Sequence, residues 1–276
     1  MTAAVVGVGP GLSGPGSTLS CRAVSRSFGA LRAVDQVDLE VRPGARHAMI
    51  GPNGAGKTTL FRLITGLLRA SAGRIELAGR DITRLSEVRR ARLGIGQTLQ
   101  HASLFGSMSA AENVALAVRR HGRITPLPRR ERAVWARVDE LLASVGLADR
   151  AAVPAAALSH GERKELEVAL ALACRPRVLL MDEPAAGMSA AERARLVALV
   201  RSLPESVTVL FVEHDLDLVF ELAAEVTVLS LGRVLLTGTP AEVRASAEVH
   251  EAYLGVERDE PLFLPPRGGD ADVPAG

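Results

Sequence analysis

Alternation of apolar and polar residues dominates the first part of the chain. Between residues 18 and 41, short apolar runs are interrupted by polar residues, most regularly over residues 33–41. This period of two predicts antiparallel strands that bury one face and leave the other in solvent. Residues 74–79 repeat the pattern and end in a glycine turn. We therefore expect an antiparallel β-subdomain in this part of the chain.

The middle of the chain changes to a helical period. Between residues 109 and 148 the apolar positions recur every three to four residues, and the break at 124–128 contains two prolines that separate two helices. We predict a helical subdomain, about residues 101–175, inserted into the larger fold. The residues expected on its buried face are Val134, Val138, Leu141, Leu142 and Val145.

The second half alternates between short apolar runs and amphipathic segments. Strands and helices that alternate in this way favour a largely parallel sheet covered on both faces, so the predicted fold class is α/β. The predicted strands are 178–181, 207–212, 226–229 and 234–236, and the predicted helices start at residues 162, 190 and 216.

Length and composition narrow the classes of protein. The 276 residues suit one large α/β domain with a smaller lobe, and a 47% apolar share with 3% aromatic residues implies a core of Ala, Val and Leu. A net charge of +2 gives no broad positive surface, so we expect no nucleic-acid partner. Cys21 and Cys174 lack metal-ligand spacing and are expected to be reduced thiols.

The two ends differ from the rest. Residues 1–17 lack a basic n-region and are broken by glycines and prolines, so we expect a flexible extension rather than a signal peptide. Residues 256–276, rich in Pro, Gly and acidic residues, are expected to be disordered. The domain between them would span residues 18–255. No apolar stretch is long enough to cross a bilayer, so a function at a membrane would need partners that hold the chain there.

Residues 51–59 match the phosphate-loop pattern G-x-x-x-x-G-K-[ST], with an apolar run before them and an amphipathic run after them. In such a loop, backbone N–H groups and the helix N-terminus bind phosphates, the lysine bridges the β- and γ-phosphates, and the following hydroxyl ligates Mg²⁺. The alternative is a glycine-rich turn that ends in a surface lysine. The proposed nucleotide-binding residues are Gly51, Pro52, Asn53, Gly54, Ala55, Gly56, Lys57, Thr58 and Thr59.

Two carboxylates follow the apolar run 178–181. In a Mg²⁺-dependent hydrolysis, Asp182 can belong to the metal's ligand shell and Glu183 can polarise the attacking water. An acidic turn after a core strand is the alternative, and the presence of a phosphate loop in the same chain argues against it.

A second anion-binding helix start is predicted at residues 158–162. Ser159 is a suitable N-cap, Gly161 permits close backbone approach, and the free N–H groups there can bind an anion, although an ordinary capped helix fits the same residues. Each remaining candidate also has a structural alternative. His214 can contact a γ-phosphate or be structural, Gln97 and Gln100 can be surface residues, and Phe28 can stack on adenine or pack the small sheet.

Together these motifs resemble those of the ATP-binding-cassette (ABC) ATPases, over nearly everything from Cys21 to Gly255. The resemblance implies an adenine platform at Phe28, Walker A at residues 51–59, a Walker B strand ending at Asp182, and a switch histidine at His214. It selects Gln100 over Gln97 as the Q-loop residue. The implied catalytic residues are Lys57, Glu183 and His214; the implied Mg²⁺ ligands are Thr58, Gln100 and Asp182; and the implied signature residues that bind ATP are Ser159, Gly161 and Glu162.

Finer features are similar to the importers of branched-chain and hydrophobic amino acids. They are residues 182–188, 212–215, 238–243 and 252–255. The urea and amide importers are close, and the ATPases that power lipopolysaccharide export are the nearest rival. Two places depart from the family pattern: His160 and Glu162 replace the usual Gly and Gln of the signature, and Ala186 and Ser189 replace the usual Ser and Asp of the D-loop.

The resemblance implies a transport motor that binds ATP and Mg²⁺. Two copies or two related subunits would close head to tail over ATP, contact transmembrane permeases and, indirectly, serve a solute-binding protein, at the cytoplasmic face of the inner membrane. Two other classes remain as alternatives. A soluble ABC ATPase of DNA maintenance or translation would carry a long coiled coil or a second cassette, and a small-molecule P-loop kinase would need neither signature nor switch histidine.

Overall fold

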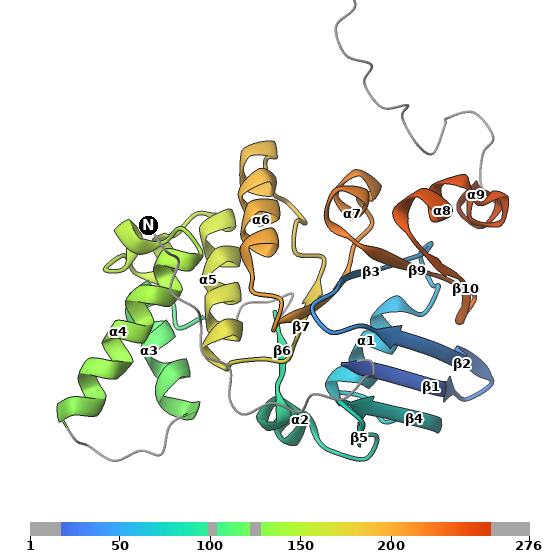
Figure 1. Ribbon diagram of the computed structural model, residues 1–276, viewed down its shortest axis with the longest axis horizontal. Coiled ribbons are helices and arrows are strands. Elements are labelled where there is room, and N and C mark those ends of the chain that lie inside the picture. Colours follow the sequence, from blue (N-terminus) through green and yellow to red (C-terminus); the bar gives the residue numbers. More distant parts are fainter. Residues whose placement is uncertain (1–17, 99–103, 122–127, 255–276) are drawn as a thin grey trace, which may run out of the picture.

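A computed structural model describes residues 18–98, 104–121 and 128–254 (Figure 1). The predicted extensions 1–17 and 256–276 lie outside these ranges, so the domain boundaries 18–255 stay a prediction. The six-stranded sheet of the described residues runs β10, β9, β3, β8, β7, β6, and all neighbours are parallel except β10 and β9. These strands are β10 (Arg233–Gly238), β9 (Glu225–Ser230), β3 (Arg46–Ile50), β8 (Thr208–Val212), β7 (Val178–Asp182) and β6 (Ile95–Gln97).

A second, four-stranded antiparallel sheet has the order β2, β1, β4, β5, as the alternating pattern predicted. Its strands are β1 (Leu19–Phe28), β2 (Leu31–Val41), β4 (Ala72–Leu77) and β5 (Arg80–Asp81). Along β2 every second residue from Val37 to Val41 is buried while the residues between them are exposed. Asp35 on β2 accepts hydrogen bonds from Arg233 on β10 at 2.9 and 2.6 Å, which ties the two sheets together.

The parallel sheet is covered on both faces, which confirms the predicted α/β class. Alternate residues of each strand belong to different apolar clusters: Ala48 and Ile50 of β3 pack in one, and Met49 packs in the other. One face is covered by α1 (Lys57–Thr65) and the antiparallel sheet, and α2 (Glu87–Leu93) packs beside α1. The other face is covered by α6 (Ala190–Ser202), α7 (Leu216–Leu222), α8 (Pro240–Ala245) and α9 (Ala247–Leu254).

The helical segment stands at the β6 side of the fold, where α3 (Ala110–His121), α4 (Pro128–Ser144) and α5 (His160–Ala173) lie together (Figure 1). Val138, Leu141 and Leu142 of α4 and Val145 just after it are buried in the same apolar cluster, and Val134 packs against that cluster. Helix α5 begins at His160, two residues before the predicted start, because Ser159 is its N-cap. Within the described ranges, no helix is both long enough and apolar enough to cross a membrane.

Candidate functional site

The phosphate loop, residues 51–59, connects the central strand β3 to α1. Its last glycine, Gly56, has φ +99° and is the N-cap of α1, with no side chain capping the helix. A Cβ atom at Gly56 would lie 2.5 Å from the Ala33 carbonyl oxygen, so only glycine fits there. The first N–H groups of α1 therefore keep their donors for an anion at the loop.

Lys57 curls back over this loop. Its Nζ donates hydrogen bonds to the carbonyl oxygens of Gly51 at 2.5 Å and Pro52 at 3.0 Å. Burial lowers the pKa of Lys57, and the carboxylates of Glu183 and Asp182 oppose that shift. The structure thus brings the lysine of the loop and the two carboxylates at the end of β7 into one neighbourhood, as the sequence predicted.

Asp182 is the last residue of β7 and is 8% exposed. Its Oδ1 is buried and makes no hydrogen bond to any residue that the structure describes. Burial, and after it the charge of Glu183, raises the pKa of Asp182. A buried carboxylate oxygen without a donor fits a hard cation, and Thr58, at the start of α1, would offer a hydroxyl oxygen of the kind that Mg²⁺ prefers.

Glu183 has an unusual backbone for a residue with a side chain. Its φ is +47°, in the left-handed region, and its N–H donates to the Val212 carbonyl oxygen of β8 at 2.9 Å. Residues held in this region are often constrained by function. The strained turn takes Glu183 out of the line of β7, and its side chain is half-buried at the carboxyl edge of the sheet.

The next strand along the sheet ends at the same edge. After β8, Glu213 is 1% exposed and accepts hydrogen bonds from the N–H groups of Ala185 at 2.9 Å and His214 at 3.2 Å. Burial raises the pKa of Glu213. The His214 side chain is 68% exposed at this edge. Glu213 thus links the turns that carry Glu183 and His214. In the sequence Glu213 stands out only as part of a family pattern, because its backbone partners are brought to it by the fold.

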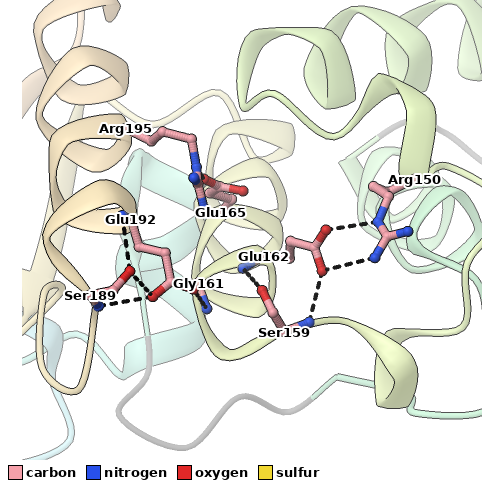
Figure 2. Close-up of polar contacts among 8 residues, drawn as sticks. All are labelled: Arg150, Ser159, Gly161, Glu162, Glu165, Ser189, Glu192 and Arg195. Carbon is pink, nitrogen blue, oxygen red and sulfur yellow. Dashed lines mark hydrogen bonds and ion pairs between the residues drawn. The ribbon is translucent and has the colours of Figure 1, made fainter.

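The signature turn, residues 158–162, forms the start of α5. Ser159 Oγ accepts from the Glu162 N–H at 3.2 Å, and Glu162 Oε2 accepts from the Ser159 N–H at 2.8 Å. Glu162 also forms an ion pair with Arg150 at 2.7 Å (Figure 2). The carboxylate of Glu162 is therefore engaged within its own chain. His160 Nε2 lies 3.1 Å from the Ala186 carbonyl oxygen, in the turn that follows Glu183.

The structure does not bring all predicted site residues together. Helices α1 and α5, which carry the phosphate loop and the signature turn, lie apart (Figure 1). Phe28, at the end of β1, is 44% exposed, and the Arg26 guanidinium carbon lies 4.6 Å from the centroid of its ring. Gln100 lies outside the described residues. Gln97, at the end of β6, donates to Glu87 at 2.7 Å.

Known proteins resemble the chain along most of its length. A family model described as ABC transporter matches residues 34–186, and one described as branched-chain amino acid ATP-binding cassette transporter matches residues 233–259. BraF of Pseudomonas aeruginosa, a high-affinity branched-chain amino acid transport ATP-binding protein, is 38% identical over 248 residues, which cover 86% of this chain and 97% of BraF. A probable ABC transporter ATP-binding protein of Azorhizobium caulinodans is 39% identical over 241 residues, 87% of this chain and 84% of its own.

Solved structures of ATP-binding cassettes have a similar fold. The crystal structure of the ADP conformation of MJ1267, an ATP-binding cassette of an ABC transporter, has a TM-score of 0.75 at 28% identity, covering 87% of this chain and 99% of MJ1267. A second MJ1267 structure gives a TM-score of 0.76 at 27% identity, with 86% and 98% covered. By its fold, its ordered motifs and these matches, the chain belongs to the ATP-hydrolysing cassettes of the ABC transporters.

Proposed function

We propose that this chain hydrolyses ATP to power an importer of branched-chain or other hydrophobic amino acids. The observation that carries the solute class is the C-terminal segment. The branched-chain cassette model covers residues 233–259, and the described part of that segment packs into the main core through Val243 and Val249, which are 0% and 1% exposed. BraF, and LivG of Escherichia coli at 35% identity, carry branched-chain amino acid transport in their names.

The proposed chemistry uses the carboxyl edge of the parallel sheet. The free N–H groups of α1 and the Lys57 ammonium bind the β- and γ-phosphates, and Phe28 offers a ring to adenine. Glu183 accepts a proton from the water that attacks the γ-phosphorus, and His214 contacts the γ-phosphate. Thr58, Asp182 and Gln100 would hold Mg²⁺, which neutralises charge on the phosphates when bound.

A second subunit would complete each site. Because α5 lies apart from α1, the signature turn of one chain would contact ATP bound to a head-to-tail partner, either a copy or a related cassette, rather than ATP at its own phosphate loop. ATP then joins the two subunits, and its hydrolysis to ADP removes the γ-phosphate that both contact. The pair reopens, and this cycle of closing and opening is the movement that a transporter can use.

A groove supports contact with a permease. It has a volume of about 370 Å³ and lies between β6 and α2 on one side and α3 and α5 on the other. Phe105 and Leu116 line it and are 55% and 44% exposed, and Asn113 fixes the Phe105 backbone through hydrogen bonds of 2.9 and 3.1 Å. Such an apolar groove fits a cytoplasmic helix of a transmembrane permease. The chain would then sit peripherally at the cytoplasmic face of the inner membrane, with a solute-binding protein acting on the permease.

The Glu183→Gln variant tests this proposal. Glutamine cannot accept the proton of the attacking water, so we expect the variant to bind ATP, to form a stable dimer in a sizing column with ATP and Mg²⁺, and to turn over at least about 100-fold more slowly than the native chain. In cells deleted for the native gene, the native chain should restore uptake of labelled leucine and the variant should not. Normal hydrolysis by the variant would remove Glu183 from the mechanism, and restored urea uptake in place of leucine uptake would reassign the solute.

A further inference from the structure

A carboxylate from another helix already occupies the start of α5. The Gly161 N–H, in the first turn of α5, donates a hydrogen bond to Oε1 of Glu192 at 3.1 Å (Figure 2). Glu192 belongs to α6, where its Oε2 accepts from the N–H of Ser189 at 2.9 Å and from the Ser189 hydroxyl at 2.8 Å. One side chain therefore joins the first turns of two helices that are neighbours in the fold but separate in the sequence.

The hydrogen bond between Gly161 and Glu192 requires glycine at position 161. A Cβ atom there would lie 2.4 Å from Glu192 Oε1 and 2.6 Å from Glu192 Cδ, so any larger residue would displace the carboxylate. A second tie lies one turn further along both helices, where Arg195 of α6 and Glu165 of α5 form an ion pair at 3.1 Å (Figure 2). Arg195 is thereby engaged with Glu165, and the ionised Glu192 is held mainly by hydrogen-bond donors.

The charge of Glu192 follows from these donors. Hydrogen bonds from Ser189, together with the one from Gly161, hold the pKa of Glu192 below its ordinary value, so the carboxylate is ionised at neutral pH. Glu162, the other carboxylate at this end of α5, is paired with Arg150. Glu192 is therefore the anion at the signature turn whose hydrogen bond would have to be exchanged for an incoming phosphate.

This contact conflicts with closure of the subunit pair. In the proposed function a γ-phosphate at the signature turn would accept a hydrogen bond from the Gly161 N–H. That N–H cannot donate a good hydrogen bond to two anions at once, and the two like charges repel. We propose that Glu192 occupies, in the separate subunit, the place on the signature turn that the partner's γ-phosphate takes on closure, and that closure requires Glu192 to leave Gly161. This inference rests on the proposed function and adds a residue that controls its closing step.

Two consequences follow for nucleotide selection. ATP can replace Glu192 because its terminal phosphate reaches the signature turn, whereas ADP has no group to make the exchange. Glu192 can release Gly161 and still cap α6, because its hydrogen bonds to Ser189 run through the other carboxylate oxygen. The side chain thus raises the ATP concentration needed for closure and keeps ADP-loaded subunits apart.

The test compares glutamine substitutions in the full-length Glu183→Gln chain. Glu192→Gln keeps the volume and the capping geometry of α6, since glutamine also serves at this position of a capping box, but it removes the charge. We expect the ATP concentration for half-maximal dimerisation, measured by light scattering, to fall about fivefold, which corresponds to about 1 kcal/mol. Binding of a fluorescent ATP analogue to the monomer should not change.

A matched control is Glu242→Gln. Glu242 caps α8 through Thr239 with the same geometry, at 2.7 Å from the Thr239 N–H. The Glu242→Gln variant also loses one negative charge, but at a site away from α5. The ATP concentration for half-maximal dimerisation should therefore stay at the parent value. A further variant, Glu165→Gln, removes the second tie between α5 and α6 without touching Gly161. It separates loss of the anion at Gly161 from loosening of the two helices.

Three outcomes would overturn the inference. An unchanged or increased ATP requirement for Glu192→Gln would mean that the contact is neutral or helps to position the signature turn. A fivefold decrease for Glu165→Gln as well would assign the effect to loosening. A parent chain that binds ATP yet stays monomeric would instead overturn the proposed function, and the role of Glu192 in closure would fall with it. Melting temperatures of all variants verify that each is folded.

Discussion

Two glycines of the phosphate loop have similar backbones and different surroundings. Gly54 and Gly56 have φ of +80° and +99°, so alanine at either position would be strained by about 1–2 kcal/mol. A Cβ atom at Gly54 would meet no heavy atom within 4 Å, whereas one at Gly56 would lie 2.5 Å from the Ala33 carbonyl oxygen. The two positions therefore separate backbone strain from steric overlap.

We predict that Gly56→Ala lowers the free energy of unfolding more than Gly54→Ala, by about 1–3 kcal/mol beyond the shared strain. The overlap with the backbone of β2 cannot be relieved by rotating a side chain. Urea unfolding of both variants without nucleotide measures the difference. Equal losses would show that the Ala33 backbone moves away freely. The close approach at Gly56 would then add nothing to the loss in the free energy of unfolding.

At the residue scale, the sequence predicted those contacts that depend on local spacing. The glycines, Lys57, Asp182 and the Ser159 cap all follow from motifs of a few residues. The contacts of Glu192 and Glu213 could not be predicted, because their partners, Gly161 and Ala185, come close only through packing of separate elements. The roles of the predicted site residues remain proposals for the experiments above.

At the scale of elements, one buried arginine joins α1 to α2. Arg90 is 1% exposed and donates from Nη1 to the carbonyl oxygens of Leu63 and Ile64 at 2.5 and 2.8 Å, in the last turn of α1. It also donates to the carbonyl oxygens of Thr83 and Leu85 at 2.9 and 3.0 Å. The guanidinium thus satisfies the C-terminal carbonyl groups of the helix that follows the phosphate loop, where a positive charge is also favourable.

We predict that Arg90→Met lowers the free energy of unfolding by at least about 3 kcal/mol, because buried carbonyl groups lose their donors. The matched control is Arg92→Met, on the same helix at an exposed position, which should change stability by less than about 0.5 kcal/mol. Thermal and urea unfolding of both variants provide the comparison. A loss of under about 1 kcal/mol for Arg90→Met would mean that water satisfies the carbonyl groups.

Elements with strong periodicity could be predicted from sequence, and short ones could not. The apolar face of α4 and the buried strands β7 and β8 were recognised because their patterns extend over several residues. Strand β6 covers only Ile95–Gln97 and α2 only Glu87–Leu93, too short for a period to be detected. Helices α8 and α9 were also missed, although Thr239 and Glu242 form a capping box that marks the start of α8.

At the scale of the whole molecule, a buried histidine makes folding depend on pH. His47 on β3 is 0% exposed, with Nε2 2.8 Å from the Thr227 hydroxyl. Burial, and after it the charge of Arg42, lowers the pKa of His47 to about 4. In the unfolded chain the pKa is about 6.5, so the unfolded state binds a proton first as pH falls. Stability from the neutral imidazole is complete above about pH 6.5 and is lost progressively toward pH 4.

We predict that this group makes the native chain about 2 kcal/mol less stable at pH 5 than at pH 7. In His47→Gln the amide can keep the hydrogen bond to Thr227 but does not titrate. Between pH 7 and pH 5 the variant should therefore lose about 2 kcal/mol less of its free energy of unfolding than the native chain does. Urea unfolding at the two pH values measures both slopes. Parallel slopes for the two proteins would show that His47 binds its proton equally in the folded and unfolded states.

The order of strands in the parallel sheet also bears on how the chain is made. Strand β3, which leads into the phosphate loop, pairs with β8 and β9, and both are encoded far downstream of it. During synthesis β3 leaves the ribosome well before residues 208–230 exist, so both of its edges stay unpaired while the intervening chain is translated. An unfinished chain that ends before β8 has the loop residues but lacks the sheet that shapes them. We expect such nascent chains to depend on chaperones, and nucleotide binding to begin only when translation is nearly complete.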